Sequence, residues 1–239
     1  MVPKVPPGAD HVPLEIRVGL VSQSPINAFR PGPNVLCRYQ HGDVIPAQEL
    51  MKRIASSPQH EIHCSGGPVQ INQQHYQGDV SLLKGQGDWL PVVSLDLETY
   101  VASVVGAEMP SSWHGEALKA QAVAARSYAM AHLARPATTA YHLGDTTRWQ
   151  VFAGEQSTTP ASRSATRETR GIILSYSGGI VESLYASNAQ VSAEAHGHLG
   201  ASMSQSGAQQ LAHQGLPFNA ILGRYYAGAS LARLTWHDE

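Results

Sequence analysis

The chain has 239 residues, of which 14 % are charged, and its formal net charge is −2. A chain of this length can bury a core as one large domain or as two small lobes. The nearly balanced charge excludes a strongly basic surface of the kind that binds nucleic acids or anionic membranes. No signal-peptide core and no transmembrane-length apolar run is visible, so we expect either a cytoplasmic protein or a chain whose signal has been removed.

Cysteines and histidines predict neither a cross-link nor a metal site. Cys37 and Cys64 allow at most one disulfide, which we do not expect, and so few cysteines fit either redox compartment. His60, His63, Cys64 and His75 supply metal-ligand atom types, but their spacing matches no tight zinc pattern.

The N-terminal part is predicted to be rich in β-strands. Residues 1–13 contain many prolines and predict an extended lead-in, whereas 14–22 alternate as a strand does. After a turn-rich loop, short apolar runs between 35 and 95 predict a meander of small strands with a short helix near 47–55.

Two helical patterns meet at Glu108-Met109-Pro110. Proline cannot continue a helix and pushes its predecessor out of the α region, so the first helix should end near Met109. Glu108 then lies on the last turn, where the partial negative charge of the carbonyls favours retention of a proton. A carboxyl that stays protonated is a candidate general acid.

The second pattern predicts a buried helix from Ser112, as its cap, to about Ala134, because no wide polar face interrupts its apolar residues. Its buried polar residues must find partners or line a cleft. Seven-residue spacing places Lys119 and Arg126 on one face of this helix, and Gln121 and Tyr128 on another. Either pair could line a cleft beside Glu108.

The C-terminal part alternates helices with a hairpin. Residues 135–158 predict a loop, and Thr159-Pro160 with Gly171 mark the ends of a helix from about 160 to 170. A hairpin and two helices follow, with strands at 172–176 and 180–186 and helices at about 204–214 and 217–226. We therefore predict an α+β fold, divided into a lead-in (1–13), a β-rich N-terminal part (14–95) and a core (96–239), or one continuous domain over 14–239.

Four segments in the same order resemble the SpoIID/LytB family, which comprises the stage II sporulation protein D lytic transglycosylases and the related amidase enhancers. The resemblance covers roughly Val80 to Leu231 and rests on LETYVASVVGAEMPSSWHGEALKAQAVAARSYAMAHL, DTTRWQVFAG, TRGIILSYSGGIVESLYASN and MSQSGAQQLAHQGLPFNAILGRYYAGASL. It implies an envelope protein that cleaves peptidoglycan glycan between N-acetylmuramic acid and N-acetylglucosamine, leaving a 1,6-anhydro end. The alternative is a non-catalytic wall-binding module that stimulates an N-acetylmuramoyl-L-alanine amidase. A scaffold that contacts only proteins has less support.

The resemblance also assigns site residues. The glutamate of its EMP motif is Glu108, which would act alone as acid and then base; Glu98 and Glu116 lie in first helical turns, where acidic residues simply favour the helix dipole. The candidate substrate-binding residues are Lys119, Gln121, Arg126, Tyr128, Trp149, Ser187, Asn188, His198, Ser204 and Gln205. Ion pairing would explain the polar residues of the buried helix equally well, and Ser204 could simply cap its helix.

This sequence departs from the family pattern at two places. Trp149 stands where the sporulation enzymes have a cysteine ligand, so we expect no zinc cofactor, although Trp149 could stack on a sugar ring. The family has several tens of residues between its SNSGG and GHGVGMSQ motifs, whereas Ser187-Asn188 here runs almost directly into His196–Gln205. One lobe of the groove is therefore expected to be deleted, with His198 or Leu199 at the position of the motif's histidine.

Overall fold

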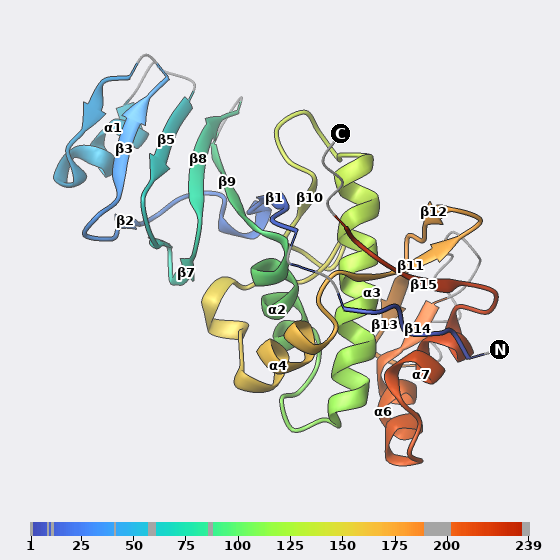
Figure 1. Ribbon diagram of the computed structural model, residues 1–239. Helices are drawn as coiled ribbons and strands as arrows, with labels where there is room; N and C mark the ends of the chain where they lie inside the picture. The colour runs from blue at the N-terminus through green and yellow to red at the C-terminus, as the bar shows by residue number, and fades with distance from the viewer. Residues whose placement is uncertain are drawn as a thin grey trace. The chain divides into compact units, whose positions relative to one another are not determined.

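A computed structural model describes the chain in two compact units of different character (Figure 1). The helical unit consists of Met1–Leu14, Leu97–Arg135 and Thr158–Glu239, and the β-rich unit consists of Glu15–Asp96 and Pro136–Ser157. Within these bounds, the described residues are 2–8, 10, 12–40, 42–56, 61–85, 88–188 and 202–235. They confirm the predicted α+β class, and none of their helices has the length and hydropathy to cross a membrane.

A seven-stranded sheet forms the centre of the β-rich unit. Its strands, in spatial order, are β10 (Leu143–Gly144), β1 (Glu15–Gly19), β9 (Trp89–Asp96), β8 (Asp79–Lys84), β5 (Glu61–Ser65), β3 (Leu36–Tyr39) and β4 (Val44–Ile45). Neighbouring strands are antiparallel except β1 and β10. Alternate residues such as Val80 and Leu82 are fully buried, as the period-two pattern requires. Strand β10 lies in a stretch that was predicted to be loop.

Smaller elements complete this unit. Strands β2 (Phe29–Pro31), β6 (Val69–Ile71) and β7 (Gln74–Tyr76) form a second sheet. The short helix predicted near 47–55 is present as 3-10 helix η2 (Ala47–Glu49) and α1 (Leu50–Ser56), and η1 (Val21–Gln23) and η3 (Gly154–Ser157) lie in loops.

Asn72 ties the loop before β2 to the β6–β7 turn. Its Oδ1 accepts hydrogen bonds from the backbone N–H groups of Asn27 (2.8 Å) and Ala28 (3.1 Å). Its Nδ2 donates to the carbonyl oxygens of Gln23 (3.1 Å) and Pro25 (3.3 Å). Asn72 has a φ of 52°, and asparagine is one of the few residues that tolerates this left-handed conformation.

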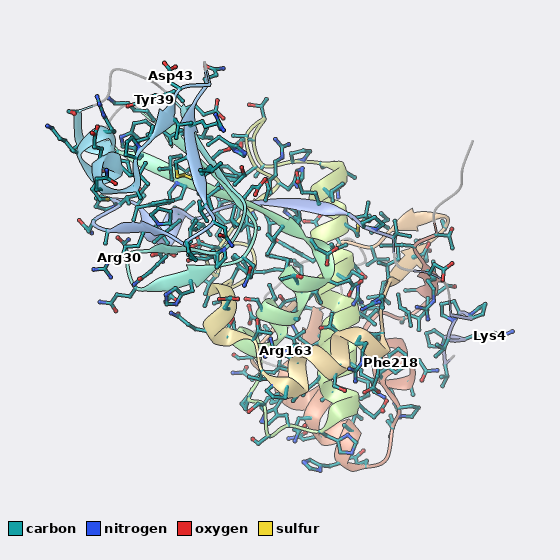
Figure 2. The ribbon with its side chains drawn as sticks, turned by 60° about the vertical axis from the view of Figure 1, so that its left-hand side comes forward. Lys4, Arg30, Tyr39, Asp43, Arg163 and Phe218 are labelled. Atoms are coloured by element: carbon teal, nitrogen blue, oxygen red, sulfur yellow. A yellow bond between two sulfur atoms is a disulfide. The ribbon has the colours of Figure 1, made fainter. Side chains whose placement is uncertain are left out.

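Cys37 and Cys64 form a disulfide, which corrects the expectation that they would not (Figure 2). The two cysteines lie directly opposite each other on β3 and β5, with their Cα atoms 4.0 Å apart. The pairing depends on the register of two antiparallel strands, and the sequence pattern does not fix this register.

Helix α3 (Gly115–Ala134) is the centre of the helical unit, and 13 of its 20 residues are buried, as predicted. Figure 1 shows α2 (Leu97–Glu108) and α4 (Pro160–Glu168) on one side of it, and α6 (Gln205–His213) and α7 (Phe218–Tyr225) on the other. Alanines at most of the buried positions let these helices approach closely.

Two small sheets lie beside α3. Strand β11 (Ile172–Tyr176) pairs with β12 (Gly179–Ile180) and with β15 (Ser230–Arg233), which was not predicted. The strand predicted over 180–186 is in fact two strands, because the Ser183 hydroxyl donates to the Ala124 carbonyl of α3 (2.7 Å) and the chain changes partners there. Beyond this anchor, β13 (Leu184–Ala186) pairs in parallel with β14 (Ser202–Ser204).

Helix ends mostly follow the predicted signals. Helix α2 ends at Glu108, and Thr159 caps α4 with the Thr159–Ser162 capping box. The cap predicted at Ser112 is wrong: α3 begins later, and the His114 ring accepts the backbone N–H of Glu116 instead (3.2 Å). Pro110 starts a turn that occupies Ser112, since the Trp113 N–H bonds to the Pro110 carbonyl.

Candidate functional site

The carboxyl group of Glu108 lies at the end of α2 and is partly buried. The next residue, Met109, continues the backbone ladder by donating to the Val105 carbonyl (3.0 Å), and Pro110 then ends it. The α2 terminus therefore holds Glu108 at a fixed place while leaving part of its side chain accessible to solvent.

Gln205 approaches the same carboxyl from the start of α6. Its side-chain Nε2 donates a hydrogen bond to Glu108 Oε2 at 3.2 Å, although the two residues are 97 positions apart. Gln205 is only 4 % exposed, so packing fixes its rotamer. A neutral amide donor orients a carboxyl oxygen without adding a full positive charge. Of the predicted site residues, these two are brought into direct contact.

Ser204 caps α6 and has a neighbour that the sequence analysis did not assign. Its hydroxyl accepts the backbone N–H of Gly207 (3.0 Å) and also hydrogen-bonds Tyr225, at the end of α7. Burial raises the pKa of the Tyr225 phenol, and the Ser204 hydrogen bond only partly opposes it. A Cβ on Gly207 would lie 2.1 Å from the Tyr225 hydroxyl. Tyr225 lies within the segment MSQSGAQQLAHQGLPFNAILGRYYAGASL, which carries the resemblance, but nothing in the sequence singled it out.

Lys119 and Arg126 lie on one face of α3, as their spacing predicted. Both form ion pairs with glutamate side chains of the helical unit. Lys119 Nζ pairs with Glu116 and with Glu168 (3.4 Å), and it lies 5.6 Å from the centroid of the Phe218 ring. Burial lowers the pKa of Lys119, but the hydrogen bonds and charges of the two carboxylates outweigh this and raise it.

Arg126 is 0 % exposed, and all five of its N–H donors are bonded. Its Nε and Nη2 bind the two carboxylate oxygens of Glu98 at 2.9 and 2.6 Å. The other three bonds go to the backbone carbonyls of Ala122, Ile172 and Thr166. The structure thus gives Arg126 the ion pair that was one of its two predicted roles. Glu98 also accepts the Gly171 N–H (3.1 Å), so it does more than favour the dipole of α2.

Gln121 and Tyr128 occupy a different face of α3 and are both buried. Within the described residues, neither polar atom of the Gln121 side chain has a hydrogen-bond partner. The Tyr128 ring stacks on His132 with centroids 4.3 Å apart, and burial, helped by the charge of Glu182, raises the pKa of its phenol to about 12.

The residues between β13 and β14 are only partly described. Ser187 and Asn188 are exposed just after β13, and the Ser187 carbonyl accepts the backbone N–H of Ser206 (3.1 Å). That bond ties the end of β13 to the first turn of α6, close in sequence to Gln205. His198 lies outside the described residues.

Trp149 belongs to the β-rich unit. Its ring packs over Gly144, where a Cβ would approach it to 2.4 Å, and the Arg148 guanidinium lies 5.0 Å from its centroid. Asp145, in the same segment, accepts hydrogen bonds from the backbone N–H (3.0 Å) and the hydroxyl of Ser22. Burial raises the pKa of Asp145 in spite of these bonds. Among the described residues, no group of three or more His, Cys, Asp and Glu could hold a metal ion.

Comparisons with known proteins found one family model and two relatives, and the part of the chain that the family model matches contains Glu108. The family model described as SpoIID, stage II sporulation protein, matches residues 85–176. An uncharacterized protein of Brachyspira hyodysenteriae is 34 % identical over 116 residues, which are 48 % of this chain and 32 % of that protein. The amidase enhancer of Bacillus subtilis is 40 % identical over 85 residues, which are 36 % of this chain and 11 % of the enhancer. The matches thus span a third or less of either relative, and residues 85–176 of this chain are similar to the SpoIID family.

Proposed function

We propose that this protein acts in the cell envelope as a lytic transglycosylase, which cleaves peptidoglycan glycan strands between N-acetylmuramic acid and N-acetylglucosamine. The observation that carries the proposal is the placement of Glu108, partly buried at a helix end and hydrogen-bonded to the neutral amide of Gln205. The named relatives, a sporulation family and an amidase enhancer, support a role at the wall.

One carboxyl group is sufficient for this reaction. Glu108 in its acid form donates its proton to the glycosidic oxygen as the bond from that oxygen to the anomeric carbon breaks. The resulting carboxylate then takes the proton of the sugar's own 6-hydroxyl, whose oxygen bonds to the anomeric carbon and closes the 1,6-anhydro ring. Glu108 returns to its acid form and no water is consumed.

The other glutamates in the described part of the helical unit have structural partners, which supports a mechanism with one carboxyl. Glu98 binds Arg126, and Glu116 binds Lys119 and the backbone N–H of Phe218 (2.7 Å). Glu168 pairs with Lys119 and Glu182 with Arg135. To serve as the second carboxylate of a hydrolase, any of these four groups would first have to leave its cation.

Gln205 is a positioning residue in this proposal, because it touches the carboxyl and holds one of its oxygens. In the proposed reaction, Oε1 of Glu108 exchanges the proton with the sugar. Ser204 fixes the start of α6 and thereby the place from which Gln205 reaches Glu108.

A second candidate function is stimulation of a wall amidase without cleavage of the glycan, and the amidase-enhancer relative favours it. Glu108 and Gln205 would then form part of a glycan-binding surface. Both candidates place the protein outside the cytoplasm, and the Cys37–Cys64 disulfide supports that location because such bonds persist in oxidising compartments.

Purified glycan strands stripped of their peptides test the first candidate. Incubation with the protein should yield anhydromuramic ends detectable by mass spectrometry, and Glu108→Gln should reduce their rate of formation by about 10²–10⁴-fold. Glu49→Gln, which changes a surface carboxylate on η2, is the matched control and should retain the rate. If the unaltered protein forms no anhydro ends, the transglycosylase proposal is wrong. An assay of amidase rate with and without the protein then decides the second candidate.

A further inference from the structure

A pocket of about 320 Å³ lies within the β-rich unit and includes no residue of the helical unit. This volume is within the range of small-ligand sites, about 300–1,000 Å³. Three segments far apart in the sequence line it: the loop after η1, helix α1 and the hairpin of β8 and β9. The lining residues are Pro25, Ile26, Met51, Ile54, Ala55, Lys84, Asp88 and Trp89.

Hydrogen bonds hold the walls of this pocket in place. The indole N–H of Trp89 donates to the Ile54 carbonyl at 2.6 Å, which ties the start of β9 to α1. Asn72 holds the loop that carries Pro25 through its bonds to the backbone of residues 23–28. A pocket with fixed walls binds a ligand without the entropic cost of ordering them.

The chemistry of the lining favours a ligand with an aliphatic body and charges of both signs. Met51, Ile54 and Ala55 present apolar side chains, while Lys84 and Asp88 add one positive and one negative charge from the same hairpin. Lys84 Nζ lies 5.8 Å from the centroid of the Trp89 ring, which helps to hold the ammonium at the pocket. The Trp89 side chain is buried, so it offers no open face for stacking a sugar. The lining also argues against a polyanionic ligand, because it offers one lysine and the negative charge of an aspartate lies beside it.

We propose that this pocket binds the peptide part of peptidoglycan, a short peptide of small aliphatic residues that carries a free ammonium and a C-terminal carboxylate. The choice of ligand rests on the proposed wall function, whereas the pocket itself uses no residue assigned to catalysis. Lys84 receives the carboxylate, Asp88 receives the ammonium, and the α1 side chains cover the aliphatic part. In this proposal the β-rich unit binds the peptide of peptidoglycan, and the helical unit carries Glu108, which acts on the glycan.

Isothermal titration of the full chain with the tetrapeptide L-Ala-γ-D-Glu-L-Lys-D-Ala tests this proposal. We expect saturable binding, and about tenfold weaker binding with Lys84→Gln or Asp88→Asn, because each removes one charge-assisted hydrogen bond. The same peptide with its amines acetylated and its carboxylates amidated should bind at least as weakly to the unaltered protein. Circular dichroism of each variant verifies that its fold is retained.

Lys52→Gln and Asp43→Asn are matched controls, because they neutralise exposed residues that do not line the pocket. Both should bind the tetrapeptide like the unaltered protein. The proposal is overturned if the unaltered protein shows no saturable binding at millimolar peptide, or if the controls weaken binding as much as the pocket variants do.

The same measurements distinguish this proposal from the proposed function. Glu108→Gln should bind the tetrapeptide normally even though it forms anhydro ends far more slowly. Peptide binding without glycan cleavage by the unaltered protein would refute only the transglycosylase, and cleavage without peptide binding would refute only the peptide site.

Discussion

The two units reach stability by different routes. The helical unit surrounds one long helix rich in alanine and accommodates a fully buried arginine by bonding every one of its donors. The β-rich unit is made of strands of two to eight residues, and it adds a disulfide and a side-chain clamp at Asn72. Short strands bury little surface each, so specific links between them contribute a larger share of stability there.

The largest expected effect comes from breaking the buried ion pair. Arg126→Met should lower the free energy of unfolding by about 3–5 kcal/mol, because the carboxylate of Glu98, whose side chain is only 12 % exposed, loses its cation. Denaturant unfolding of the full chain measures the loss. Arg163→Met, at an exposed position of α4, is the control and should cost little. Adding Glu98→Gln to Arg126→Met should recover part of the loss, and a single-variant effect below about 1 kcal/mol would mean that the pair does not organise this core.

Removal of the cross-link should have the next largest effect. Cys37→Ser with Cys64→Ser is expected to lower the free energy of unfolding by about 2–4 kcal/mol, since the bridge closes a loop between cysteines 27 positions apart. Amide hydrogen exchange should locate the loss of protection in β3 and β5. A reducing agent should reproduce the effect in the unaltered protein and leave the double variant unchanged. If protection falls equally along α3, the two units do not have separate stabilities.

The Asn72 clamp should contribute less than the disulfide. Asn72→Ala is expected to cost about 1–3 kcal/mol, because the backbone groups of the preceding loop lose their partners and alanine disfavours the positive φ. Asn72→Gly removes the same hydrogen bonds but permits the backbone conformation, so it should be less damaging. Equal losses in the two variants would assign the whole effect to the hydrogen bonds. An unchanged free energy of unfolding in both would show that the clamp is dispensable.

The smallest effect is expected at a helix cap of the helical unit. Thr159→Ala should cost about 1 kcal/mol, because the Ser162 N–H at the start of α4 loses its acceptor (3.0 Å). Thermal unfolding of this variant and of the neighbouring Thr158→Ala provides the comparison. A loss as large as that of the disulfide variant would contradict the view that packing around α3 dominates this unit.

The helical unit could be largely predicted from the sequence because its signals are local. Pro110 placed the end of α2, Thr159-Pro160 placed the start of α4, and the lack of a polar face predicted a buried α3. What failed depended on contacts distant in sequence. Strand β15 exists because it pairs with β11, and the division of β12 from β13 follows from the bond of Ser183 to α3.

The β-rich unit and the geometry of the site were harder to predict. The strand register that brings Cys37 opposite Cys64 involves no local signal. Similarly, the resemblance identified Glu108 and Gln205 separately, but only the packing of α6 shows that their side chains meet. The sequence left two roles open for Arg126, and the geometry around its guanidinium is what favours the ion pair.

The parallel pairing of β13 with β14 has a consequence for how this architecture tolerates change. Ala186 stands opposite Ser204, and the Ser187 carbonyl receives the Ser206 N–H, so both borders of the intervening stretch are secured beside Gln205. Because these two contacts involve only residues outside the stretch between the borders, we expect an insertion or excision there to leave Gln205, and with it the contact to Glu108, in place.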